Sequence, residues 1–174
     1  MVKRIIAGLG MMCLAFAFLS CPSEPNSYPR IVIDTFPPIE FSAATDTTLR
    51  LYDSDGDLVA FDDNNPDVPA LYQPSARIDY TGGLISGTYY IRVNSDAGNT
   101  GYYVIRVLEL DTGESLPAYD FPGITSDDSG FEPDDAADGN IPDNPIDIGL
   151  GNANQKNRRL IPDTDVDWLR LELP

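Results

Sequence analysis

The stretch Tyr-Tyr-Val-Ile-Arg-Val-Leu-Glu-Leu, at positions 102–110, decides the fold class of this chain. Its side chains alternate with a period of two, so that Tyr103, Ile105 and Val107 share one face of an extended segment. Aromatic and β-branched residues, which favour strands, dominate it. The stretch predicts a β-strand that needs partner strands elsewhere in the chain.

The same two-residue period recurs in segments on both sides of this strand. No window of comparable length has apolar residues at the three-to-four-residue spacing of a helix. The segments that show the two-residue period are 30–35, 49–52, 58–61, 89–94 and 166–173. Asp53–Asp57 contains Asp-Gly, a strong signal for a tight hairpin, and Gly98–Gly101 predicts a second hairpin between the strands at 89 and 102. We therefore predict an all-β protein, an antiparallel β-sandwich.

Composition supports this fold class and excludes several activities. The 174 residues carry 28 acidic and 11 basic side chains, a net charge of −17, and no histidine. Aspartate outnumbers glutamate 22 to 6, beside 14 Gly and 15 Pro, a balance typical of turns rather than helices. The lack of histidine excludes Ser-His-Asp and Cys-His catalysis and histidine-ligated zinc. The acidity argues against nucleic acid as a partner and favours divalent cations.

The first 20 residues have the layout of a secretory signal peptide. Lys3 and Arg4 precede an apolar run from Ile5 to Leu19 that is short for a membrane span. Removing this segment takes away two basic and no acidic residues, so the mature charge becomes 9 − 28 = −19. The mature chain is thus predicted to be extracytoplasmic.

Cys21 follows this segment directly. Cys13 would leave with the signal peptide, so Cys21 would have no internal disulfide partner. With Ser20 before it, Cys21 resembles the lipid-modified first residue of bacterial lipoproteins, although Phe18 and Leu19 depart from the usual pattern. The resemblance implies a lipid anchor in a bacterial membrane, at the cell surface or in the periplasm. The alternative is a secreted protein with a free thiol.

Changes in composition divide the rest of the chain. We expect a polar, proline-bearing tether at 21–29, a β-sandwich core at 30–110 and a linker at 111–130, which is rich in Pro, Gly and Asp. Residues 131–174 open with an acidic stretch and end in the predicted strand 166–173.

Five motifs in the core resemble the bacterial pre-peptidase C-terminal (PPC) domain family. They are Leu-Arg-Leu-Tyr-Asp-Ser-Asp-Gly-Asp at 49–57, Asp-Asp-Asn-Asn at 62–65, Ala-Arg-Ile-Asp-Tyr at 76–80, Gly-Thr-Tyr-Tyr-Ile-Arg-Val at 87–93 and Gly-Tyr-Tyr-Val-Ile-Arg-Val at 101–107. The resemblance implies a compact β-sandwich or jelly roll, attached outside the cell to secreted enzymes or surface proteins and not itself catalytic.

Two later motifs resemble the beginning of the same domain, so the family order is inverted here. They are Glu-Pro-Asp-Asp at 132–135 and Asp-Thr-Asp-Val-Asp-Trp-Leu at 163–169. The chain is either one circularly permuted domain or a tandem array cut off inside its second repeat. Residues 131–174 alone are too few to bury a stable core, which favours one composite sandwich.

The family-like acidic motifs also suggest a calcium site. In calcium-binding members of the wider collagen-binding relatives of this family, ligands come from the opening motif and from acids just before the Asp-Trp strand. By resemblance, the candidate ligands are Glu132, Asp134, Asp135, Asp165 and Asp167. The cluster Asp53, Asp55 and Asp57 fits a hairpin better, because an EF-hand counted from Asp53 would need Gly at position 58 and Glu at position 64, which hold Leu and Asn.

These inferences predict a non-catalytic extracytoplasmic lipoprotein that serves as a surface binding or structural module. Its predicted ligand is a protein or a glycan, and Ca²⁺ is predicted to stabilise it. The alternative is a secreted hydrolase or an accessory fragment of a secreted peptidase. Asp111-Thr112-Gly113 matches the aspartic-protease tripeptide, but it occurs once and directly follows a strand. We interpret it as a turn.

Overall fold

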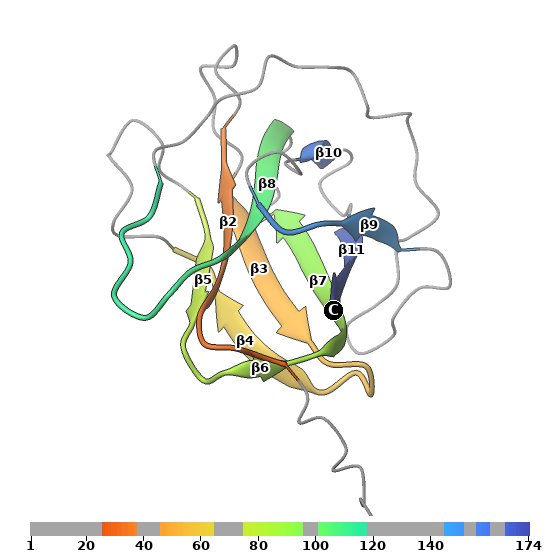
Figure 1. The fold of residues 1–174 in the computed structure, drawn as a ribbon. Coiled ribbons are helices and arrows are strands. Elements are labelled where there is room, and N and C mark those ends of the chain that lie inside the picture. The colour runs from red at the N-terminus through yellow and green to blue at the C-terminus, as the bar shows by residue number, and fades with distance from the viewer. Residues whose placement is uncertain are drawn as a thin grey trace, which may run out of the picture.

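The computed structural model describes residues 26–37, 46–64, 75–95, 101–117, 145–151, 156–160 and 166–174 (Figure 1). Every regular element in these ranges is a β-strand. Within them no helix is long and apolar enough to cross a membrane. The strands are β1 (Ser27–Tyr28), β2 (Ile31–Phe36), β3 (Thr47–Tyr52), β4 (Leu58–Asp62), β5 (Arg77–Tyr80), β6 (Leu84–Ile85), β7 (Gly87–Ser95), β8 (Gly101–Glu109), β9 (Ile146–Ile148), β10 (Lys156–Leu160) and β11 (Val166–Leu173).

Two main sheets face each other, and the predicted all-β sandwich is confirmed. The four-stranded sheet has the order β10-β8-β2-β5, and the five-stranded sheet has the order β4-β3-β7-β11-β9. Strands β1 and β6 form a separate two-stranded ribbon. Among the described strands, every pairing is antiparallel except that of β9 with β11, which is parallel. An isolated parallel bridge also joins Val107 to Leu150.

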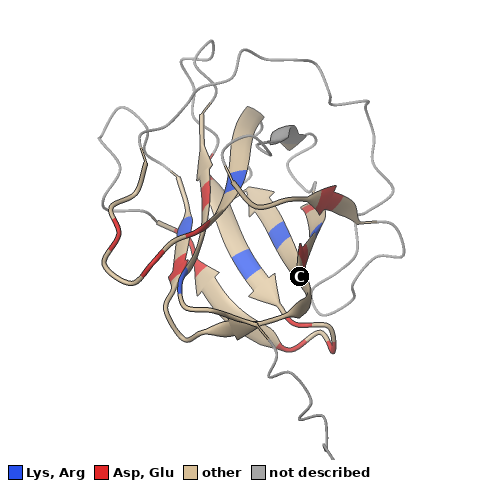
Figure 2. Cartoon of the chain, viewed as in Figure 1, with Lys and Arg blue, Asp and Glu red and all other residues tan. Residues whose placement is uncertain are grey.

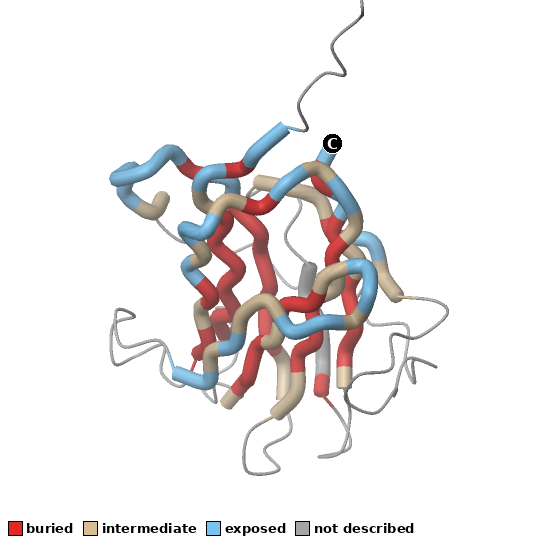
Figure 3. Tube along the Cα trace, turned by 90° about the horizontal axis from the view of Figure 1, so that it is seen from below, coloured by how far each residue is buried: buried red, intermediate tan, exposed pale blue. Residues whose placement is uncertain are grey.

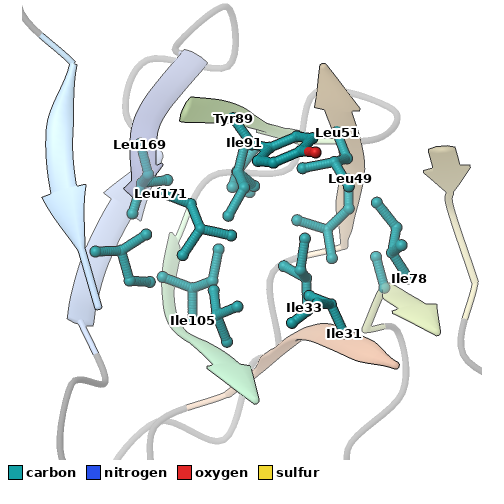
Figure 4. Packing of buried hydrophobic residues seen from close by; sticks show 14 of the residues in the cluster. Ile31, Ile33, Leu49, Leu51, Ile78, Tyr89, Ile91, Ile105, Leu169 and Leu171 are labelled. Atoms are coloured by element: carbon teal, nitrogen blue, oxygen red, sulfur yellow. The ribbon is translucent and has the colours of Figure 1, made fainter. Parts of the chain in front are cut away.

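The core lies between the two sheets and follows the alternation of the strands. Ile31 and Ile33 of β2 point toward Leu49 and Leu51 of β3 across the sandwich (Figure 4). Ile105 of β8 also lies in this core, and all five side chains are fully buried. Burying one such side chain contributes about 1.5–3 kcal/mol, so these inward faces are the main source of stability. Figure 3 shows the buried strands surrounded by exposed connections.

The predicted hairpin at Asp53–Asp57 is confirmed, since β3 and β4 pair across it. The Asp53 Oδ1 atom accepts hydrogen bonds from the backbone N–H groups of Asp55 and Asp57, at 3.0 and 2.9 Å. Gly56 has a φ of 84°, which glycine adopts without steric cost. The aspartate in this turn therefore organises the backbone.

The predicted hairpin at Gly98–Gly101 is wrong, because β7 and β8 lie in different sheets. β7 pairs with β3 and β11, whereas β8 pairs with β2 and β10. Ile91 of β7 and Ile105 of β8 enter the same core from opposite sides. The chain therefore crosses from one sheet to the other instead of turning back beside itself. Residues 96–100 lie outside the described part.

The last strands of the chain belong to the same two sheets as the first ones. β11 lies between β7 and β9, and Leu169, Leu171 and Leu173 enter the shared core. β10 pairs with β8 at the edge of the other sheet. Residues 145–174 thus contribute strands to both layers of the sandwich.

The outer face of the four-stranded sheet is covered by the chain that follows β8. Val32, Leu108 and Leu110 form a second buried cluster, with Leu116 packed against it. The Arg30 guanidinium donates a 2.6 Å hydrogen bond to the Glu114 carbonyl oxygen. The first residues of the segment predicted as a linker therefore lie on this sheet.

The sandwich has two poles. The terminal pole holds Asn26, β6, the Asp53–Asp57 turn and Pro174, and it lies at the bottom of the view in Figure 1. At the opposite pole β2, β4, β7 and β10 end and β3, β5, β8 and β11 begin.

Candidate functional site

Two polar contacts tie the sheets together at the opposite pole. The Tyr103 hydroxyl of β8 donates a short hydrogen bond to the Asp167 Oδ2 atom of β11, and both side chains are buried. The Oγ1 atoms of Thr35 in β2 and Thr47 in β3 are hydrogen-bonded at 2.5 Å. Each pair joins one strand from each sheet, so this end of the core is polar where the rest is apolar.

Asp167 is the one predicted calcium ligand within the described residues. It lies opposite Val93 in the register of β11 and β7, and it is only 2% exposed. A buried carboxylate is costly unless hydrogen bonds compensate it, and Tyr103 supplies one of these. The structure therefore places Asp167 inside the sandwich as a cross-sheet contact.

The other predicted site residues lie outside the described ranges. They are Cys21, Glu132, Asp134, Asp135 and Asp165. Among the residues that the structure describes, no group of three or more His, Cys, Asp or Glu side chains is placed to hold a metal ion. The calcium site remains a prediction.

An ion cluster on the outer face of the four-stranded sheet was not expected from the sequence. Asp34 of β2 is fully buried, and its carboxylate accepts hydrogen bonds from Arg106 Nε at 2.7 Å and Arg106 Nη2 at 3.1 Å. Arg77 Nη2 lies 3.2 Å from Asp34 Oδ2. Both arginines stand directly opposite Asp34 on the neighbouring strands, and the Arg106 guanidinium also lies 5.5 Å from the centre of the Phe36 ring.

Arginine and aromatic side chains gather on the outer face of the five-stranded sheet. Arg50 and Arg92 are cross-strand neighbours, and their Nη1 atoms lie 2.9 and 3.2 Å from the Asn94 Oδ1 atom. The Arg50 guanidinium lies 5.0 Å from the centre of the half-exposed Phe61 ring. Figure 2 shows basic positions on adjacent strands of this sheet. Two arginines thus lie side by side on adjacent strands of this face, one beside an aromatic ring.

Two exposed or half-buried aspartates have shifted pKa values in opposite directions. The hydrogen bonds from Arg30, at 2.8 and 2.7 Å, lower the pKa of Asp79. Burial raises the pKa of Asp62, although the Arg77 backbone N–H, 2.8 Å from Asp62 Oδ2, opposes this shift. By linkage, ionised Asp79 stabilises the fold above its unfolded pKa, whereas ionised Asp62 destabilises it.

Asp111-Thr112-Gly113 forms the predicted turn at the end of β8. The Glu114 N–H donates to the Asp111 carbonyl oxygen at 3.0 Å, and the Asp111 N–H donates to Glu114 Oε2 at 3.0 Å. Gly113 has a φ of 87°, and Asp111 is exposed. These contacts account for the tripeptide as local structure.

The chain was compared with protein-family models, with curated proteins and with solved structures, and none of the three comparisons found a match.

Proposed function

We propose that this protein is an extracytoplasmic bacterial lipoprotein, anchored through Cys21, whose PPC-like β-sandwich is a non-catalytic module for binding or surface structure. The signal-like segment, the position of Cys21 and the five family-like motifs support this proposal. The ligand is a protein or glycan rather than nucleic acid, since the mature chain has a net charge of −19.

The non-catalytic assignment is supported by the contacts of the two buried carboxylates among the described residues, Asp34 and Asp167. Asp34 binds two arginines, and Asp167 accepts a hydrogen bond from Tyr103. Both carboxylates link strands, which is a structural role. Turnover of protein or glycan substrates by the wild-type chain, lost in the Asp111→Ala variant, would contradict this assignment.

Anchoring through Cys21 predicts that the processed protein partitions with membranes. Cells expressing the full chain should incorporate labelled fatty acid into it, and the Cys21→Ser variant should incorporate none and lose membrane association. The Ser20→Ala variant is the matched control, because it keeps a small residue before the cysteine and should still be labelled. A wild-type chain that stays soluble and unlabelled would exclude the anchor.

We also propose that Ca²⁺ binds the family-like acidic motifs and stabilises the sandwich. The candidate ligands are Glu132, Asp134, Asp135, Asp165 and Asp167, and carboxylate oxygens are suitable ligands for this ion. Excess Ca²⁺ should raise the melting temperature above its value in chelator, because an ion that binds only the folded state stabilises it.

The calcium effect should be lost in the Asp134→Ala variant and kept in Asp55→Ala, whose position lies in the β3–β4 turn. Melting temperatures measured by circular dichroism test this. Equal values with chelator and with Ca²⁺ would remove the calcium proposal and leave the anchoring proposal intact.

A further inference from the structure

From Asn26 onward, hydrogen bonds and strand pairing hold the chain against the terminal pole. The Asn26 side-chain amide and the Tyr28 hydroxyl both donate to the Pro174 carbonyl oxygen, at 3.3 and 2.5 Å. The Asn26 carbonyl oxygen accepts from the Ser86 N–H at 2.9 Å, and β1 pairs with β6. The entry point of the folded chain and the end of β11 therefore lie together at one pole.

The proposed lipid would be attached very close to this pole. Five residue steps separate Cys21 from Asn26, and an extended chain of that length spans at most about 18 Å. The eight residues of β11 run from the opposite pole to this one, a length of about 27 Å. The segment from Cys21 to Asn26 is thus shorter than β11, the strand that spans the sandwich from pole to pole.

We infer that the terminal pole faces the lipid surface and that the opposite pole is presented away from it. This inference rests on the proposed anchor at Cys21. Ile85, which pairs with Ser27 in the β1–β6 ribbon, is 53% exposed and places an apolar side chain at the membrane-facing pole.

Two single-cysteine variants can measure this orientation. Cys13 would leave with the signal peptide and Cys21 would carry the lipid, so the wild-type protein should have no free thiol. Asp55→Cys places a label in the turn at the terminal pole, and Asn64→Cys places one just beyond β4 at the opposite pole; both positions are exposed. The five residues of β4 separate the labels by about 17 Å along the strand.

The full-length lipidated variants, each carrying a donor dye, would be reconstituted into vesicles of phosphatidylethanolamine and phosphatidylglycerol with an acceptor dye on the headgroups. Energy transfer should be greater from position 55 than from position 64, because position 55 lies nearer the bilayer by about the length of β4. Wild-type protein that takes up no dye, and Cys21→Ser protein that does not float with vesicles, are the controls.

Failure of the proposed orientation can be distinguished from failure of the proposed anchor. Protein that floats with the vesicles but gives equal transfer from both positions, or greater transfer from position 64, would overturn the orientation and leave the anchor standing. Protein that does not float would overturn the anchor itself, and the orientation with it.

Discussion

Replacing Asp34 with alanine is expected to lower the free energy of unfolding by about 3–5 kcal/mol, because it leaves buried guanidinium groups without their carboxylate. Asp34 and Arg106 are both fully buried, and Arg106 binds the carboxylate through Nε and Nη2. Arg77 Nη2 also lies 3.2 Å from Asp34. Urea unfolding of the mature chain and the variant would measure the loss.

The matched control is Asp79→Ala, which removes a carboxylate held by Arg30 through the same two-pronged geometry. Asp79 is exposed on the surface, and such pairs contribute about 1 kcal/mol or less. Equal losses in the two variants would contradict the assignment of Asp34 as the structural ion centre. Because Arg30 lowers the pKa of Asp79, the contribution of this pair is present above the unfolded pKa of about 3.9 and is lost as the pH falls through the lower folded value.

Removing residues 131–174 is expected to abolish the cooperative unfolding of the rest of the chain. β11 pairs with β7 over its whole length and lies inside the five-stranded sheet. Its loss removes Leu169, Leu171 and Leu173 from the core and leaves β7 with an open edge. At about 1.5–3 kcal/mol for each buried side chain, these three residues alone contribute an amount similar to the whole stability of a typical domain.

A point variant of the same strand gives a graded form of this prediction. Leu171→Ala should cost about 2–5 kcal/mol, because it leaves a cavity between the sheets. Glu172→Ala, the neighbouring exposed position, should change stability by less than about 0.5 kcal/mol. A loss at Leu171 no larger than that at Glu172 would mean that β11 does not share the core.

Alternation of side chains was sufficient to predict the long strands and their inward faces. Tyr103, Ile105 and Val107 do share one face, and they lie in the core. The short strands β1, β6 and β9 contain two or three residues, too few to show a period. β9 forms because β11 offers it an edge to pair with, whereas β1 and β6 pair only with each other.

Turn chemistry predicted one hairpin correctly and one wrongly, and the difference is physical. At Asp53–Asp57 the aspartate and the glycine fix the backbone locally. Between β7 and β8 the apolar faces of both strands must be buried against each other, which places them in opposite sheets. A glycine-bearing connection alone cannot reveal which outcome packing favours.

The buried polar contacts were the least predictable features, although the sequence carries a signal for them. Asp34 and Arg106 each interrupt a run of apolar residues, which indicates that both need partners. They lie 72 positions apart, so only the pairing of β2 with β8 shows that they meet. The same holds for Asp167 and Tyr103, whose contact depends on how the two sheets face each other.

The central claim is that the first and last parts of the mature chain build one sandwich. Thermal unfolding of residues 21–130 beside residues 21–174, followed by circular dichroism, tests it most directly. We predict a single cooperative transition for the longer chain and none for the shorter one. An unchanged transition in the shorter chain would contradict the claim.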